Sequence, residues 1–290
     1  MSTDTAHPAV ATARPDGFAA WRDQTRAFAT RYARELFRNK TVLFWTIAFP
    51  VGFYLLTITV FVDQADLPAQ AMPYVKAGTA VTYGTFGAII ASLNSFGQQL
   101  SMDFEDDRYT LFRSLPIAPS ADLAGRMVAG VALSIAAFGA VVVAAIATGG
   151  TFSIASPAAL PIVAVALIAF AVFWMVVAVV VATAVRDARY ASIITVSMAM
   201  ALYFLTGYNG GNPDAFQGPD VLLNWLPNTL PTRLIASHIA ATPDQYAQPG
   251  SLAAPDPFVG TAVLVAYAVA ALLVGIVVMR RVVYQRGVLS

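Results

Sequence analysis

The chain has 290 residues, of which 58% are hydrophobic and only 11% are charged. A soluble globular protein carries roughly 25% charged residues and about 45–50% apolar ones. The charges are also unevenly placed, because no Lys, Arg, Asp or Glu occurs between Met127 and Val185. This composition excludes an ordinary soluble protein, and a net charge of +1 gives no electrostatic reason to expect nucleic-acid binding.

Residues 1–17 mix Ala, Thr, Pro and Asp without periodicity, and we expect them to form a disordered cytosolic tail. Residues 18–40 show helical spacing, with apolar side chains along one face and arginines around it. The apolar positions are Phe18, Trp21, Phe28, Tyr32 and Leu36; Arg22 and Arg26 flank them, and Arg31, Arg34 and Arg38 lie opposite. Such an amphipathic helix is typical of a membrane surface. We favour this interpretation over packing on the chain's own helices, and the two are compatible.

Six uncharged apolar stretches approach the ~20 residues with which a helix crosses ~30 Å of hydrocarbon. They cover approximately Thr41–Val62, Ala77–Leu100, Met127–Thr148, Ala158–Val185, Tyr190–Thr206 and Phe258–Met279. Backbone polar groups in lipid must be bonded internally, and no stretch alternates as a barrel strand does. We therefore predict an all-α polytopic membrane protein, with six transmembrane helices in a domain over residues 41–290.

The basic residues predict the orientation of these helices. If the amino end is cytoplasmic, every Lys and Arg except Lys76 and Arg233 falls on the cytoplasmic side. The opposite orientation would invert this bias, against the positive-inside tendency. We therefore expect a multi-pass protein of the cell membrane with both termini in the cytoplasm.

The cytosolic loop over residues 101–118 combines charged and apolar side chains. Asp103 is a typical helix cap, and Glu105, Asp106 and Asp107 would occupy a first turn in which the helix dipole favours anions. Phe104, Leu111 and Leu115 then form an apolar stripe, with Arg108 beside it, Arg113 near the far end and Pro116 as the stop. This pattern fits a docking helix, and a solvated connector resting on lipid headgroups is the alternative.

The last external segment, residues 207–257, opens with the turn-forming run Gly207–Pro213. Two short apolar stretches follow, Val221–Pro227 and Leu230–Ala241. Both are too short to cross a bilayer, so we expect re-entrant or interfacial helices before the last span.

The predicted spans carry no ionisable residue, and the chain has no Cys and only two His, His7 and His238. Its two lysines, Lys40 and Lys76, lie in no phosphate-binding loop. Ion-coupled carriers commonly place an ionisable group in mid-membrane, so a secondary transporter and an intramembrane enzyme are both disfavoured. We expect no catalytic residue, metal or cofactor on this chain, and any energy must come from a partner.

Neutral polar residues are nevertheless present in the second and fifth spans. Tyr83, Asn94 and Gln98 lie near one line of the second span, and Tyr203 lies in the fifth. These four residues are candidates for a translocation pathway. Helix packing through small and amide side chains is the commoner use of such residues and remains the alternative.

Together these features resemble the permease subunit of ATP-binding-cassette exporters of the second permease class, the type V fold. The most specific stretch runs from Arg113-Ser-Leu-Pro116 to Leu123-Ala-Gly125-Arg126, which is similar to the family's pattern between the cytosolic helix and the third span. Glu105 matches an acidic residue upstream, and Leu230–Leu234 resembles a Pro-centred segment before the last span. Tyr109-Thr110 departs from the Gly-Thr or Gly-Val of many members.

The resemblance implies a permease that forms a homodimer, or a heterodimer with a similar permease, and binds two copies of a separate ATPase subunit. Residues 101–118 would hold the coupling helix, with Phe104, Leu111 and Leu115 for burial and Glu105, Arg108 and Arg113 for register. Residues 18–40 would be the connecting helix at the lipid surface, and substrate would pass between the two permeases. A non-transporting membrane scaffold or assembly factor is the alternative function.

Overall fold

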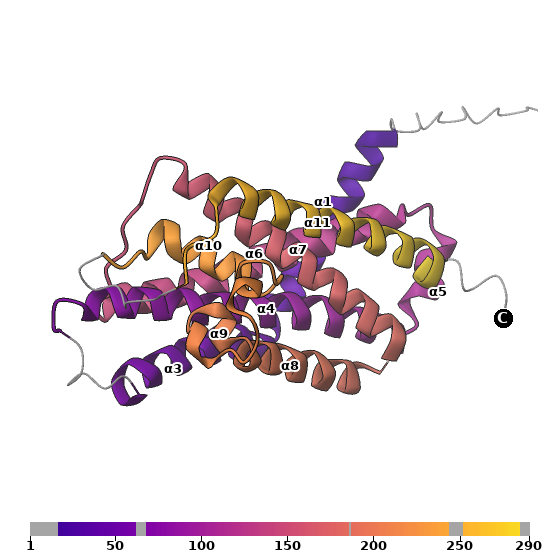
Figure 1. Ribbon diagram of the computed structural model, residues 1–290. Helices are drawn as coiled ribbons and strands as arrows, with labels where there is room; N and C mark the ends of the chain where they lie inside the picture. The colour runs from indigo at the N-terminus through magenta and orange to yellow at the C-terminus, as the bar shows by residue number, and fades with distance from the viewer. Residues whose placement is uncertain (1–16, 62–67, 186, 244–251, 285–290) are drawn as a thin grey trace, which may run out of the picture.

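The computed structural model describes residues 17–61, 68–185, 187–243 and 252–284, without the side chains of Phe61, Arg113 and Ala188. The tail predicted over residues 1–17 lies outside these residues, apart from Gly17. Within the described part the chain forms helices and no strand, and the longer helices run roughly along one axis (Figure 1). The elements are α1 (Gly17–Arg38), α2 (Lys40–Leu43), η1 (Phe44–Ala48), α3 (Phe49–Leu56), η2 (Thr57–Phe61), α4 (Met72–Glu105), α5 (Arg108–Ser114), α6 (Pro119–Ala147), α7 (Ala159–Val185), α8 (Ala188–Leu205), α9 (Gly207–Gly210), η3 (Pro213–Ala215), η4 (Asp220–Asn224), α10 (Thr229–Ile239), α11 (Pro257–Val278) and η6 (Met279–Tyr284).

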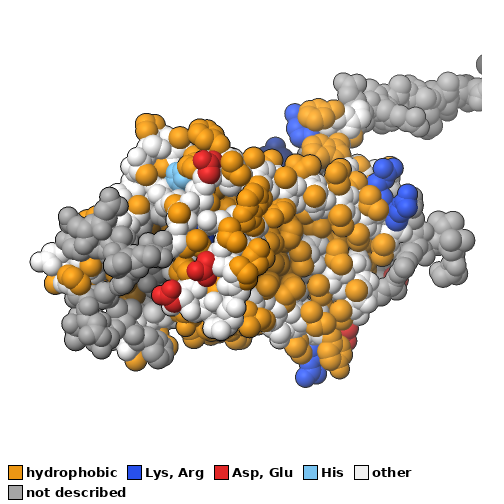
Figure 2. Space-filling model, in the orientation of Figure 1, with side chains coloured by type: hydrophobic (Ala, Val, Ile, Leu, Met, Phe, Trp, Pro, Cys, Tyr) orange, Lys and Arg blue, Asp and Glu red, His pale blue; other side chains and the backbone are white. Residues whose placement is uncertain are grey.

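Four helical segments are long and apolar enough to cross a membrane: Lys40–Val60, Pro119–Ala147, Ala159–Val185 and Pro257–Tyr284. The other two predicted spans also lie in helices, the second within α4 and the fifth within α8. The apolar helix of the fifth is shorter, covering Arg189–Leu205. The chain is therefore an all-helical, multi-pass membrane protein. On the face drawn in Figure 2, hydrophobic side chains cover the middle of the molecule, and Lys and Arg side chains lie in its right-hand half.

Helix α4 forms the centre of the bundle, where it packs against α6, α7 and α8. Every residue from Ala80 to Gly97 is buried, so this helix meets other helices around its whole circumference. Several of its hydroxyl side chains are bonded within the protein; the Ser92 and Ser134 hydroxyls, for example, lie 3.0 Å apart. Burial explains why α4 has a more polar sequence than a helix that faces lipid.

The first membrane segment is a continuous but irregular helix from Lys40 to Phe61. Two π-helical stretches, η1 and η2, interrupt the α-helical hydrogen-bond pattern. Pro50 lies at the start of α3, and a Cβ added at Gly87 of α4 would lie 3.2 Å from the Pro50 Cγ and 3.2 Å from the Thr46 carbonyl oxygen. The absence of a side chain at Gly87 therefore lets this segment approach α4 closely.

Short helices occur where the external apolar stretches were predicted. α10 buries Leu230, Leu234 and Ile235 completely, in a cluster with residues of α4, α7 and α11. The backbone N–H of Ser153 donates to the Ile239 carbonyl over 3.0 Å, which fixes the loop between α6 and α7 on the end of α10. Gly207 has a φ of 63°, and a Cβ there would lie 2.1 Å from the Asn212 carbonyl oxygen. Glycine is therefore required at this turn.

Helix α1 packs on α6. Phe28, Tyr32 and Leu36 of the predicted apolar face are buried against the protein's own helices, which was the alternative interpretation of this face, whereas Phe18 is 75% exposed at the projecting end of the helix. A Cβ at Gly125 would lie 2.5 Å from the Phe28 Cβ and 2.9 Å from both the Thr25 carbonyl oxygen and the Ala29 nitrogen. The backbones of the two helices therefore touch at Gly125, and α1 is a packed part of the bundle.

Replacing Gly125 with Ala tests this close contact. The new methyl group meets backbone atoms that cannot rotate away, so we expect a loss of about 1–3 kcal/mol in stability, as for overpacked cores. Gly139→Ala in the same helix is the matched control, because no atom lies within 4 Å of a Cβ there, and the added methyl should be neutral or stabilising. Thermal unfolding of the purified permease measures both, and equal melting temperatures would contradict the packing.

Candidate functional site

A cluster of buried polar groups lies at the end of the bundle where α1, α4, α5, α6 and η6 meet. Its centre is an ion pair one turn apart on α6, in which the Arg126 Nε lies 3.1 Å from the Asp122 Oδ1 with neither side chain accessible to solvent. The guanidinium carbon of Arg126 also lies 3.9 Å from the centre of the Tyr32 ring. We define the charge cluster as Tyr32, Asp103, Tyr109, Asp122, Arg126 and Tyr284.

Three tyrosine hydroxyls converge on the Asp122 carboxylate. Tyr32 donates to Oδ1 over 2.9 Å, and Tyr109 and Tyr284 donate to Oδ2 over 2.9 and 3.2 Å. The three rings come from α1, α5 and η6, which are far apart in the sequence. One carboxylate on α6 therefore holds three other elements in register.

Asp103 is the second carboxylate of the charge cluster. It is 1% exposed near the C-terminal end of α4, where it forms an ion pair with Arg126. Arg31 and Arg108 contact its other oxygen from outside, at 2.9 and 2.8 Å. Arg108 also reaches Asp106 at 2.9 Å and Glu35 at 3.6 Å. Asp103 thus links α4 to α1 through Arg31, to α6 through Arg126 and to α5 through Arg108.

The protonation states follow from burial and from these neighbours. Burial alone would raise the pKa of Asp103, but Arg126, Arg31 and Arg108 outweigh burial and hold this pKa below its usual value. Burial raises the pKa of Tyr109 well above its usual value, with only partial opposition from Arg126. At neutral pH Asp103 is therefore ionised, and the Tyr109 phenol keeps the proton that it donates to Asp122.

The predicted helix cap at Asp103 is wrong. The α4 helix continues through Asp103 to Glu105, and α5 begins only at Arg108. The break falls at Asp107, whose φ of 53° is a left-handed conformation that Asp adopts more readily than most residues. The Asp103 carboxylate bonds arginines instead of the first backbone N–H groups of a helix, because α4 is held by its neighbours up to its last turn.

The predicted docking residues divide into exposed and enclosed ones. Leu111 is 60% and Leu115 47% exposed, and Glu105 is also at the surface. Phe104 is half-buried, with its ring 5.2 Å from that of Tyr109, and Arg108 is occupied by its ion pairs. The side chain of Arg113 lies outside the described residues. Leu111 and Leu115 therefore form an outward apolar surface, while Phe104 and Arg108 belong to the interior support of α5.

Helix α5 is anchored to the rest of the protein by its other face. Phe112 packs edge-on against Phe28 of α1, with 5.7 Å between ring centroids, and Tyr109 reaches Asp122. The loop that follows is tied to α1, because Gln24 donates to the Pro116 carbonyl over 3.0 Å and accepts from the Ala118 N–H over 2.9 Å. Helix α5 and the loop after it are therefore joined directly to α1 and α6.

The four pathway candidates lie along α4 and α8 in different surroundings. Tyr83 borders a cavity of about 500 Å³ together with Thr57, whose hydroxyl lies 2.7 Å from that of Tyr83. Gln98 borders a second cavity, of about 440 Å³, near the charge cluster. Asn94 accepts from the Thr195 hydroxyl over 3.4 Å, and Tyr203 packs against Phe86 with 4.3 Å between ring centroids. Tyr83 and Gln98 thus line open space, whereas Asn94 and Tyr203 make helix contacts.

Sequence analysis did not predict the charge cluster, although one signal of it was present. Asp122 and Arg126 stand four residues apart at the start of an otherwise uncharged apolar helix, a spacing that favours an ion pair. No local pattern identifies Tyr32, Tyr109 or Tyr284 as partners of Asp122, because their contacts join distant segments. Among the described residues no group of three or more His, Asp or Glu side chains could hold a metal ion.

Comparison with protein families gives a match to the family described as ABC-2 type transporter, over residues 23–237. The matched region includes most of α1, the whole α4–α5–α6 junction and the helices up to α10. A search of curated proteins finds no match to this chain.

Removing the Asp103 carboxylate should destabilise the protein strongly. Asp103→Asn leaves Arg126 with one carboxylate in a buried site, and breaking such pairs costs about 3–5 kcal/mol. Asp106→Asn, on the same loop, is the control: Asp106 is 52% exposed and pairs with Arg108 alone, so a loss of at most about 1 kcal/mol is expected. Chemical or thermal unfolding of the detergent-purified variants compares the two, and equal losses would show that Asp103 is not a structural centre.

The same ion pairs predict an acid-dependent contribution to stability. Because the folded-state pKa of Asp103 is lowered, its ionised form stabilises the fold at pH values above the unfolded pKa of about 3.9. This contribution disappears as pH falls from there through the folded-state pKa. The stability difference between wild type and Asp103→Asn should be constant from about pH 5 to 7 and should narrow below about pH 4. Unfolding curves across this pH series measure it, and a constant difference at all pH values would refute the assignment.

Proposed function

Because the chain belongs to the ABC-2 type transporter family, we propose that it is the permease of an exporter that works as a dimer and is driven by ATPase subunits docked on α5. The family makes this chain the membrane component of an ATP-binding-cassette transporter, with hydrolysis on a separate subunit. The observation that carries the docking proposal is the position of α5: Leu111 and, just after the helix, Leu115 are exposed, while Tyr109 of the same helix bonds Asp122 in the charge cluster.

We place six crossings in the cell membrane, with α4 and α8 added to the four long apolar segments. The contacts of Asp122 support this number, because Tyr32, Tyr109 and Tyr284 reach it from three points of the chain. Two long helical segments separate Tyr32 from Tyr109, namely residues 40–61 and α4. Four separate Asp122 from Tyr284, namely α6, α7, α8 and α11. Each return to the same end requires an even number of crossings. With the four long apolar segments alone, one crossing would separate Tyr32 from Tyr109 and three would separate Asp122 from Tyr284, and both numbers are odd.

Contacts at the opposite end agree with this topology. Lys76, near the start of α4, donates to the Thr148 carbonyl at the end of α6 over 2.7 Å. The loop after α6 is bonded in turn to α10. This end carries few basic residues, so we assign it to the external side and the charge cluster to the cytosol. At 11 residues α10 is too short to span a bilayer, and we propose that residues 207–257 re-enter the membrane from outside.

The proposed coupling passes through the charge cluster. When the ATPase moves α5, Tyr109 and Phe112 move with it, and they contact Asp122 of α6 and Phe28 of α1. Separating the buried charges would cost several kcal/mol, so the junction moves as a unit and does not absorb the displacement locally. The motion therefore reaches α6 and α4, and α4 lines the proposed pathway between two copies of the permease.

The pathway itself is proposed to follow α4 and α8. Tyr83 and Gln98 border the two cavities along α4, toward opposite ends of that helix. Asn94 and Tyr203 lie between them at the contact of α4 with α8, where a change in helix packing would open or close the route. Neutral hydroxyl, amide and aromatic groups of this kind place no ion in the membrane.

Replacing Leu111 and Leu115 together with Asp tests the docking surface. Burial of a leucine contributes about 1.5–3 kcal/mol, so losing two should weaken binding of the co-expressed ATPase subunit by at least about 100-fold. Phe104 stays unchanged, because it supports α5 from within. Affinity purification from detergent-solubilised membranes measures the ATPase retained per permease.

Ile154→Asp provides the matched control for this experiment. Ile154 is 61% exposed on the loop between α6 and α7, at the opposite end of the molecule from α5, and its replacement should leave ATPase binding intact. The amount and monodispersity of the inserted permease should be equal in all variants. Full ATPase retention by the double Leu variant would exclude α5 as the docking helix.

A further inference from the structure

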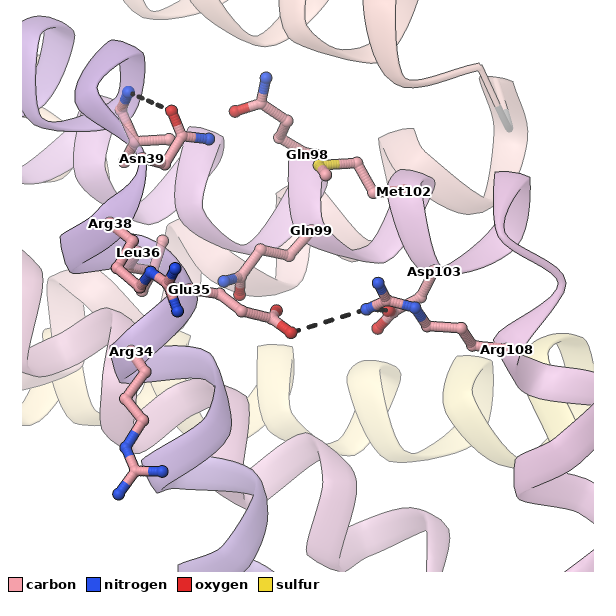
Figure 3. A pocket seen from close by; sticks show the side chains of 11 residues that line it. Arg34, Glu35, Leu36, Arg38, Asn39, Gln98, Gln99, Met102, Asp103 and Arg108 are labelled. Atoms are coloured by element: carbon pink, nitrogen blue, oxygen red, sulfur yellow. Dashed lines mark hydrogen bonds and ion pairs between the residues drawn. The ribbon is translucent and has the colours of Figure 1, made fainter.

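A cavity of about 440 Å³ opens between the C-terminal end of α1 and the last turns of α4 (Figure 3). Its α1 wall includes Arg34, Leu36 and Arg38, and its α4 wall includes Gln98 and Met102. This volume lies within the range of about 300–1,000 Å³ typical of small-molecule sites. The cavity borders the charge cluster at Asp103. The proposed pathway and docking helix give no role to its basic side chains Arg34 and Arg38.

The positive charge of this cavity is only partly neutralised. Glu35 and Asp103, its two acidic side chains, are already engaged by Arg31, Arg108 and Arg126. Arg34 and Arg38 have no ion-pair partner within the described part of the chain. They stand one helical turn apart, so both lie along the same side of α1. Figure 3 shows Arg34 at the edge of the group, with its guanidinium extending away from the other labelled side chains. Two unpaired guanidinium groups therefore flank one cavity.

The cavity also lies where the chain enters the membrane. α1 ends at Arg38, and the first membrane segment begins at Lys40, with Asn39 accepting hydrogen bonds from the backbone of Thr41 and Val42. Met102 contributes apolar surface to the cavity and is 42% exposed. Phe37, at the end of α1, and Phe44, at the start of η1, are more than half exposed. Cationic donors at headgroup depth next to apolar groups match a lipid that carries a negative headgroup.

We propose that this cavity binds the phosphate group of an anionic phospholipid, in the leaflet where α1 meets the first membrane segment. The guanidinium groups of Arg34 and Arg38 donate paired hydrogen bonds to the phosphate oxygens, a geometry that arginine provides and lysine does not. The exposed side chain of Met102 contacts the glycerol and upper acyl carbons. This lipid site requires only that the segment Lys40–Val60 lies in the membrane; it does not depend on ATPase docking or on transport.

The test is lipid retention by the full-length permease in nanodiscs of phosphatidylcholine, with and without phosphatidylglycerol. Native mass spectrometry then counts the lipids that stay bound. We expect wild type to retain phosphatidylglycerol selectively and the double variant Arg34→Gln/Arg38→Gln to bind it roughly tenfold or more weakly. ATPase co-purification should be unchanged in this variant, which separates the result from the docking experiment.

Arg280→Gln/Arg281→Gln is the matched control, because it removes the same charge from two exposed arginines beyond α11. It should retain phosphatidylglycerol as wild type does. Equal loss in the two double variants would reduce the effect to general surface charge, and equal retention in all three proteins would exclude the cavity; either result overturns the proposal. A phosphatidylcholine sample titrated with inorganic phosphate distinguishes the source. If free phosphate stabilises the wild type but not the double variant Arg34→Gln/Arg38→Gln, and phosphatidylglycerol is not retained, the proposal is also overturned.

Discussion

The structure depends on one buried ion pair at the start of α6. Arg126 and Asp122 are both withdrawn from water, and burying charge is tolerated only when each charge is paired and hydrogen-bonded. The Asp122 carboxylate also accepts hydrogen bonds from three other elements, through Tyr32 of α1, Tyr109 of α5 and Tyr284 of η6. The requirement to satisfy two charges thus fixes the arrangement of the whole end of the bundle. Replacing the pair by apolar residues could preserve stability, but it would remove the directional contacts that set this arrangement.

A second constraint is the complete burial of α4 between Ala80 and Gly97. A helix enclosed by other helices gains little from hydrophobicity in a membrane, because lipid is as apolar as its neighbours; close packing and hydrogen bonds between helices stabilise it instead. Gly84 and Gly130 serve this packing. A Cβ at Gly84 would lie 2.7 Å from the Phe138 ring, and one at Gly130 would lie within 3.3 Å of the Ser95 Oγ of α4. The polar and small residues of α4 therefore follow from its central position.

The positions of the long apolar helices could be predicted from the sequence, whereas the contacts at the junctions between helices could not. Apolar stretches predicted the membrane helices closely, since the third, Met127–Thr148, lies within Pro119–Ala147 apart from its last residue. Such stretches follow from the local requirement that lipid-facing backbone be bonded within its own helix. The interpretation of Asp103 failed because capping rules consider only the next few residues. Its partners Arg31 and Arg126 are 72 and 23 positions away. Likewise, a single stripe through Phe104 and Leu111 was expected, but the left-handed turn at Asp107 places them on different sides of the loop.

Charge and its absence divide this protein into two mechanical regions. The chain has no ionisable side chain between Met127 and Val185, so the helices there are held by packing contacts and not by charges. At the end of the bundle that we assign to the cytosol, the proposed coupling helix is joined to α1, α4, α6 and η6 by buried polar and charged groups, whose separation is costly. We expect a displacement of α5 to move the charge cluster as a unit and to change the packing of the uncharged helices. A motor subunit bound at α5 would in this way change the packing around α4, where the neutral polar residues lie, without breaking the junction on which it acts.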